Sequence, residues 1–156
     1  MLQTSNGSVV KIGHVAKQLR IAVETIRMYE REGLFIPAKT TTGQRVFTEE
    51  DVHWMNCIRR LIKEQGLNLA GIRRLLALMP CWQIKPCSLA DRRGCPAFTG
   101  ATQPCWTLKP NLPAICRTAD CRECQVYRSA SDCTNLKTLL YKLQHKEATS
   151  SSTRSR

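Results

Sequence analysis

The stretch from residue 80 to residue 133 restricts the fold of this chain more than any other part. It contains eight of the nine cysteines, six of the seven prolines and none of the three histidines. Proline breaks or kinks the interior of a helix, so long helices are excluded between residues 80 and 113. We therefore expect short turns and loops here, with the cysteines either binding metal or packing as a small core.

Within this stretch the chain repeats itself. Residues 80–86 (PCWQIKP) return 24 positions later as residues 104–110 (PCWTLKP), with five positions identical. The repeat contains two of the three tryptophans, Trp82 and Trp106, each directly after a cysteine. Such rings would shield sulfur from solvent, or alternatively form the centre of a cysteine-rich knot.

The charge of the chain favours a polyanionic partner. Lys and Arg total 24 against 12 Asp and Glu, a net charge of +12, which suits nucleic acid or an anionic membrane surface. No apolar run approaches the roughly 20 residues that cross a bilayer, and the N-terminus lacks the apolar core of a secretory signal. We therefore expect a cytoplasmic protein, in a compartment where dense cysteines more often bind metal or act in redox chemistry.

Apolar periodicity and turn residues predict a helical domain over residues 11–79. The pattern predicts a helix around 12–19, a second over 23–32 ended by Gly33, and a hairpin turning at 40–43. A third helix should start at Thr48 with Asp51 at its third position, and a fourth should stop at Pro80. The predicted core of the domain includes Leu19, Ile26, Trp54, Ile62, Leu75 and Met79.

The other predicted parts are a flexible N-terminus (1–10), a cysteine-rich sensory or metal-binding module (80–133), a dimerisation helix (134–147) and a disordered tail (148–156). The dimerisation helix is predicted from leucines that share one face, Leu136, Leu139, Leu140 and Leu143. The fold class is therefore mainly α: a winged helix-turn-helix domain, a small irregular cysteine-rich module and a short C-terminal helix.

Two short helices, a tight turn and a basic hairpin describe a winged helix-turn-helix, whose second helix enters the major groove of DNA. Arg27, Tyr29 and Arg31 lie on that second helix, and such side chains can reach phosphates and base edges. Lys39 and Arg45 belong to the hairpin, which would lie against an adjacent groove. The alternative is that the arginines only solvate an amphipathic helix.

Three motifs of this domain resemble the MerR family of bacterial transcription regulators. They are IGHVAK at residues 12–17, VETIRMYEREGL at 23–34 and GQRVFTEEDV at 43–52, in the family's order and spacing. The resemblance implies a homodimer that binds an inverted-repeat operator in double-stranded promoter DNA, distorts it and works with RNA polymerase. By this resemblance, Thr25, Arg27, Tyr29 and Arg45 match family positions that contact DNA. Lys17 and Arg31, which are cations of the same motifs, complete the set of predicted DNA contacts.

The cysteine spacing predicts a sulfur-dominated metal site. Cys121 and Cys124 have the two-residue spacing that lets thiolates bind one metal from a single turn, and Cys116 extends this to a spacing seen in plant-type ferredoxins. Soft thiolates select zinc, copper(I) or an iron–sulfur cluster. The candidate ligands, with the subset left open, are Cys81, Cys87, Cys95, Cys105, Cys116, Cys121 and Cys124.

Cations between the cysteines would offset thiolate charge and lower the thiol pKa values. These cations are Lys85, Arg92, Arg93, Arg117 and Arg122. Residues 81–128 also resemble the two-CW cysteine-rich segment found beside bacterial sensory modules, through the paired Cys-Trp units, Cys95-Pro96-Ala97-Phe98 and the run from Cys121 to Tyr127. That resemblance brings no particular ligand, so an iron–sulfur cluster, zinc, a reversible dithiol switch and another ligand all stay open.

The sequence therefore predicts a non-enzymatic, MerR-type DNA-binding regulator that responds to metal or redox state, with an iron–sulfur cluster or zinc as cofactor. One alternative is a DNA-binding protein whose cysteines form a purely structural zinc knot. A second alternative, a thiol oxidoreductase using Cys121 and Cys124, lacks the thioredoxin-like alternation of strands and helices. Cys57 is predicted to be a small core residue and Cys133 a free thiol.

Overall fold

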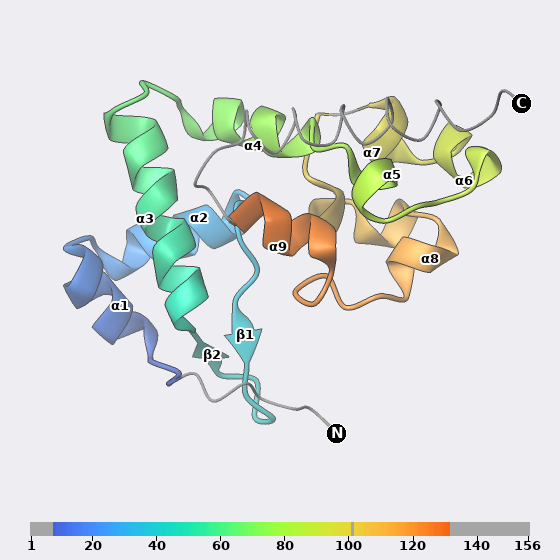
Figure 1. Cartoon of the computed structure of the whole chain (residues 1–156). Coiled ribbons are helices and arrows are strands. Elements are labelled where there is room, and N and C mark those ends of the chain that lie inside the picture. The colour runs from blue at the N-terminus through green and yellow to red at the C-terminus, as the bar shows by residue number, and fades with distance from the viewer. Residues whose placement is uncertain (1–7, 101, 132–156) are drawn as a thin grey trace, which may run out of the picture.

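The computed structural model describes residues 8–100 and 102–131 (Figure 1). The predicted dimerisation helix (134–147), the predicted tail (148–156) and Cys133 lie outside the described residues. In the described part, helices dominate and the sheet has two short strands, as expected for a mainly α fold. No helix in that part is both long and apolar enough to span a membrane.

The first two helices form the helix-turn-helix. They are α1 (Ile12–Leu19) and α2 (Val23–Arg31), in agreement with the predicted limits to within a residue. The turn between them passes through Arg20, whose backbone is left-handed with φ of 53°. Past the end of α2, Gly33 takes the same region with φ of 71°, which glycine adopts without steric cost.

The hairpin follows as predicted. Strands β1 (Ala38–Lys39) and β2 (Arg45–Val46) are antiparallel, and Gly43 in the turn has φ of 81°. Directly after β2, the backbones of Phe47 and Val10 exchange two hydrogen bonds of 2.9 Å. Val10 was expected in the flexible N-terminus, and this expectation is corrected because Phe47 fixes it beside the hairpin.

α3 (Glu49–Lys63) begins at the predicted cap. The Thr48 hydroxyl accepts a hydrogen bond from the Asp51 backbone N–H at 3.3 Å, and the Asp51 carboxylate accepts one from the Thr48 N–H at 2.9 Å. This reciprocal pair satisfies two N–H groups that a helix start otherwise leaves free. α4 (Leu69–Ala77) begins at Asn68, whose side chain also accepts a backbone hydrogen bond.

The core of this domain is mostly the predicted one. Ile62 is half-buried, whereas Leu75 is 37% exposed. The prediction for Leu75 is wrong because α4 presents only its Ile72 and Leu76 side to the core, with 0% and 3% exposure. The predicted core residues that are buried are Leu19, Ile26, Trp54 and Met79, and Cys57 is buried with them.

Short helical turns follow α4, as the prolines predict. Both copies of the sequence repeat begin such a turn directly after their first proline, at Pro80 and at Pro104. The segments are α5 (Cys81–Ile84), α6 (Leu89–Arg93), α7 (Pro96–Thr99), the 3₁₀ turns η1 (Cys105–Thr107) and η2 (Lys109–Asn111), α8 (Ala114–Arg117) and α9 (Gln125–Ser131).

α9 joins the two halves of the chain. It contacts both α3 and α5, and in Figure 1 it lies between the N-terminal helices and the short helices of the cysteine segment. Trp106, Tyr127 and Ala130 belong to the same buried cluster as the N-terminal core. The cysteine segment is therefore packed against the helix-turn-helix half over a shared core.

Candidate DNA-binding surface and thiol pocket

The arginines predicted to contact DNA lie exposed on α2. The side chains of Arg27 and Arg31 are 57% and 60% exposed, and both pair with Glu24 of the same helix. Their guanidinium nitrogens lie 3.8 Å and 2.7 Å from the Glu24 carboxylate. Exposed ion pairs contribute only about 0.2–1 kcal/mol, so a phosphate can replace this carboxylate.

Arg45 joins the hairpin to α2. Its Nε donates hydrogen bonds to both carboxylate oxygens of Glu30, at 3.0 and 2.8 Å. These hydrogen bonds raise the pKa of the Arg45 guanidinium above its already high value. Since Arg45 belongs to β2 and Glu30 to α2, the pair links the hairpin to the second helix.

The remaining predicted DNA contacts differ in accessibility. Lys17 is exposed on α1, and Thr25 is half-buried near the start of α2. Tyr29 is only 4% exposed because its ring packs into the core, and this burial raises the pKa of its hydroxyl. The ring of Tyr29 therefore belongs to the core, and a contact of its hydroxyl with DNA stays a prediction.

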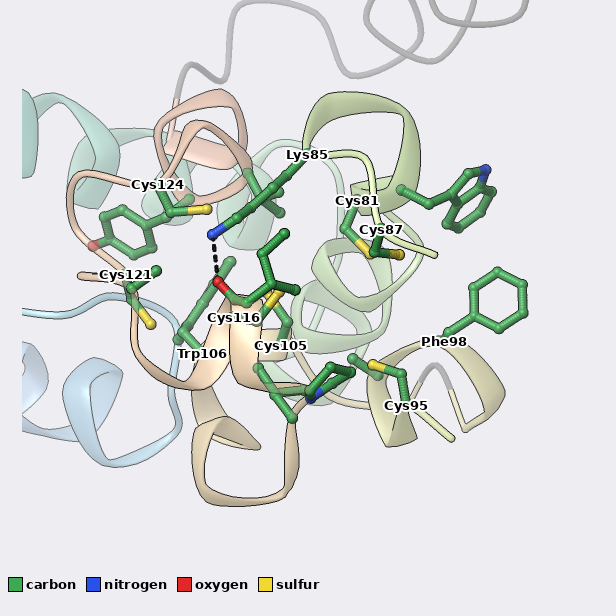
Figure 2. Close-up of a pocket in the computed structure, with 18 of the residues that line it drawn as sticks. Cys81, Lys85, Cys87, Cys95, Phe98, Cys105, Trp106, Cys116, Cys121 and Cys124 are labelled. Carbon is green, nitrogen blue, oxygen red and sulfur yellow. Dashed lines mark hydrogen bonds between the residues drawn. The ribbon is translucent and has the colours of Figure 1, made fainter. Parts of the chain in front are cut away.

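All seven cysteines predicted as ligands line one pocket (Figure 2). The pocket lies within the cysteine segment and encloses a cavity of about 50 Å³. A cavity of this size holds an ion or a few water molecules and is far smaller than the roughly 300–1,000 Å³ of small-molecule sites. Figure 2 shows Cys121 and Cys124 at one end and Cys81, Cys87 and Cys95 at the other, with Cys105 and Cys116 between them.

Sulfur provides the soft metal-ligating side chains of this pocket. Its lining contains no His, Asp or Glu, and the seven thiols form no disulfides. Such a donor set fits a soft metal ion or cluster. Among the residues that the structure describes, however, no three Cys, His, Asp or Glu side chains converge closely enough to hold a metal ion. Binding one would therefore require the thiols to move toward each other.

Burial raises the pKa of four thiols in the pocket. The pKa of Cys105 is raised to about 12 and that of Cys81 to about 11, first by burial and then by neighbouring thiols. Burial also raises the pKa values of Cys116 and Cys121, although lysines oppose the shift. The prediction that cations lower these pKa values is wrong here because desolvation outweighs them. Protonated thiols are poor nucleophiles, so these four react slowly with oxidants at neutral pH.

Cations and aromatic rings complete the pocket walls. Lys85 crosses the pocket, where its Nζ donates a hydrogen bond of 3.0 Å to the carbonyl of Ile115 (Figure 2). The guanidinium of Arg92 lies 6.0 Å from the ring centre of Trp82 and 5.8 Å from that of Phe98. Both lining cations are therefore placed to offset charge that develops on the thiols.

Arg122, another of the predicted charge-compensating cations, pairs instead with Asp51 of α3. Its guanidinium nitrogens lie 3.0 and 3.2 Å from the two carboxylate oxygens, and Asp51 is 5% exposed. Sequence reasoning assigned Asp51 to helix capping alone and missed this pair. No local signal in the sequence pointed to the pair, because the two residues lie 71 positions apart.

Comparisons with known proteins concern the N-terminal half. Residues 10–78 match the MerR HTH family regulatory protein profile. The HTH-type transcriptional regulator ZntR homolog of Haemophilus influenzae is 40% identical over 70 residues, which are 44% of this chain and 51% of that protein. Heavy metal-dependent transcription regulator 2 of Rhizobium meliloti is 34% identical over 70 residues, 44% of this chain and 47% of that protein.

A third relative is the putative heat shock protein HspR of Streptomyces coelicolor, 31% identical over 75 residues, 48% of this chain and 50% of that protein. The chain thus spans about half the length of the curated relatives it matches. No solved structure matches the chain.

The helix pair, the hairpin and the exposed arginines define the N-terminal half as a winged helix-turn-helix domain. More particularly, it is a MerR-family helix-turn-helix domain, since the profile match and the three sequence motifs cover the same residues. The match ends at residue 78, shortly before Cys81. The thiol pocket therefore lies outside the part of the chain that this family profile describes.

Proposed function

We propose that this protein is a MerR-type transcription regulator whose thiol pocket binds a soft metal ion or an iron–sulfur cluster and thereby controls transcription. The observation that carries the proposal is the gathering of seven cysteines in one pocket packed against a MerR-family helix-turn-helix domain. The protein would act as a homodimer on an inverted-repeat operator, together with RNA polymerase.

Charge and exposure support the DNA-binding part of this proposal. Arg27, Arg31 and Arg45 present their side chains to solvent on the second helix and the hairpin, where a winged domain meets DNA. The chain as a whole carries a net charge of +12. Arginine binds phosphate by paired hydrogen bonds in the same way as it binds a carboxylate, so Glu24 and Glu30 mark the positions that phosphates can take.

The chemistry of the pocket supports the metal part. Seven free thiols with no competing carboxylate or imidazole favour zinc, copper(I) or iron–sulfur clusters over hard cations. One relative of the helix-turn-helix domain is named a heavy metal-dependent transcription regulator. When bound, the metal would supply a fixed point for several thiolates, and Lys85 and Arg92 would offset their charge.

Metal analysis of the anaerobically purified chain tests this function. We expect stoichiometric zinc, or iron with sulfide and visible absorbance, and a sharp loss of occupancy in Cys121→Ser, since a serine hydroxyl is a much weaker ligand. The control is Asn111→Ser, an exposed residue of the same segment. Cys121→Ser should keep its operator affinity within about tenfold, roughly 1.4 kcal/mol, while transcription stops responding to the metal.

Two results would contradict the proposal. A wild-type chain that takes up no zinc, copper(I) or iron–sulfur cluster has no soft-metal site. A chain that unfolds throughout when the metal is removed, and whose transcription never depends on metal concentration, contains a structural zinc knot instead of a sensor.

A further inference from the structure

A four-residue loop ties the thiol pocket to the DNA-binding surface. Residues 33–36 lie in the segment 32–37 that connects α2 to β1, so this loop determines how the second helix and the hairpin lie relative to each other. Three side chains of the cysteine segment, Trp106, Arg122 and Tyr127, form hydrogen bonds with its backbone. We propose that these three are positioning residues that couple the state of the pocket to the DNA-binding surface, an inference that rests on the function proposed above.

Trp106 holds the start of the loop. Its indole nitrogen donates a hydrogen bond of 2.7 Å to the carbonyl oxygen of Gly33. Besides its left-handed backbone, Gly33 has no room for a side chain, since a Cβ there would lie 2.4 Å from the methyl carbon of Thr107. The turn η1 therefore lies directly against the C-terminal end of α2.

Arg122 and Tyr127 hold the end of the loop. The backbone N–H of Ile36 donates a hydrogen bond of 2.8 Å to the Tyr127 hydroxyl, and the Ile36 carbonyl accepts one from the Arg122 guanidinium. Arg122 is fixed in turn by Asp51 in the first turn of α3. Both backbone polar groups of Ile36 are thus bound by the cysteine segment.

Each positioning residue is also close in sequence to a pocket cysteine. Trp106 follows Cys105 directly, Arg122 lies two positions before Cys124, and Tyr127 lies three positions after it. The rings of Trp106 and Tyr127 line the pocket and meet edge to face, with 5.0 Å between their centres. Since the thiols must move to surround a metal ion, these side chains and the loop that they hold would move with them.

A contact of this kind couples two binding sites, and the coupling is reciprocal. If zinc changes the affinity of the protein for its operator, the operator changes the affinity for zinc by the same factor. The coupling factor is therefore the quantity that separates a positioning role from a merely structural one. A substitution that only weakens folding lowers both affinities without abolishing their dependence on each other.

The test uses the full chain, zinc under reducing conditions, and an operator duplex selected in vitro with the wild-type protein. Trp106→Phe removes the indole N–H and keeps a ring, and Tyr127→Phe removes the hydroxyl that binds Ile36. Trp82→Phe is the matched control, because Trp82 lies at the equivalent place in the repeat and lines the pocket. Operator affinity is measured by fluorescence anisotropy with and without zinc, and zinc affinity with and without operator.

We expect a coupling factor of about five or more in the wild type and in Trp82→Phe, and less than about twofold in Trp106→Phe and Tyr127→Phe. Zinc affinity without DNA should stay within about threefold of the wild type in all three variants. Two different substitutions are used so that, if one variant fails to fold, the other still tests the inference. Amide hydrogen exchange at residues 33–36 should also respond to zinc in the wild type, and not in these two variants.

Wild-type coupling retained in both Trp106→Phe and Tyr127→Phe would overturn the inference, as would a wild type that binds zinc and operator independently. A wild type that binds no zinc, copper(I) or iron–sulfur cluster, or that fails to bind DNA at all, gives a different result. That outcome contradicts the proposed function itself and removes the inference with it.

Discussion

The carboxylate of Glu24 lies 2.7 Å from the guanidinium of Arg31 on the exposed side of α2. The same carboxylate lies 3.8 Å from Arg27, and Glu30 binds Arg45 of the hairpin in a similar way. The arginines proposed to bind phosphate are therefore paired with carboxylates in the free protein. DNA must displace these carboxylates, and their own negative charge opposes the approach of phosphate.

Replacing Glu24 by Gln should strengthen DNA binding. The change removes one negative charge and frees Arg27 and Arg31, so we expect affinity for non-specific duplex DNA to rise about 3- to 30-fold, roughly 0.7–2 kcal/mol. Glu64→Gln is the matched control, because Glu64 pairs with Arg60 on α3 in an equally exposed i,i+4 pair. Equal affinities for the two variants would mean that α2 does not face DNA.

Removing the arginines should have the opposite effect. Arg27→Ala and Arg45→Ala are each expected to weaken binding to all sequences and to reduce the magnitude of the log–log salt slope by about 1, because each removes one phosphate contact. Arg93→Ala removes another exposed arginine, on α6, and should leave the slope unchanged. An unchanged slope for both helix and hairpin variants would contradict the proposed surface.

Features that depend on residues a few positions apart were predictable from the sequence. The cap formed by Thr48 and Asp51, the end of α2 shortly before Gly33 and the short helices among the prolines all follow from local geometry. The spacing of Cys121 and Cys124 predicts metal ligation from local geometry in the same way, and this ligation stays a prediction. It did not predict that all seven candidate cysteines line one pocket, since that depends on how the short helices pack.

Features that depend on packing between distant segments were not predictable. Helical periodicity places Tyr29 and Leu75 on a face, and does not say how wide a stripe the neighbouring elements cover. As a result Leu75 is exposed, against its prediction as a core residue, and the burial of the Tyr29 ring was not predicted. Similarly, Asp51 and Arg122 are 71 residues apart, and nothing local distinguishes Arg122 from the other cations of the segment.

The buried thiols predict a loss of stability at alkaline pH for the metal-free protein. The pKa of Cys105 is raised from 9.0 to about 12 and that of Cys81 to about 11. Above pH 9 the unfolded chain therefore loses protons that the folded chain retains, so stability is full below pH 9 and falls as pH rises toward 11 or 12. By pH 10.5 the loss should be on the order of 1–2 kcal/mol per thiol.

Urea unfolding with a chelator and a reductant at pH 7, 9 and 10.5 measures this dependence. Cys105→Ala should unfold more easily at pH 7, because it leaves a cavity, yet lose less stability between pH 9 and pH 10.5 than the wild type. A free energy of unfolding that is constant or rises over this interval would show that these thiols are not buried in solution.

The ion pair between Arg122 and Asp51 should stabilise the packing of the cysteine segment on α3. The two side chains are 22% and 6% exposed, and removing one partner of a buried pair leaves an uncompensated charge that costs about 3–5 kcal/mol. We expect Arg122→Gln to lower the free energy of unfolding by about 3 kcal/mol, and the exposed control Arg117→Gln to change it by less than about 0.5 kcal/mol. Since Arg122 also binds the carbonyl of Ile36, the effect of Arg122→Gln alone is larger than the energy of the ion pair.

A double-mutant cycle isolates the energy of this ion pair. Arg122→Gln, Asp51→Asn and the double variant should give a coupling of about 1–3 kcal/mol. Additive effects would show that the two side chains stabilise the fold independently.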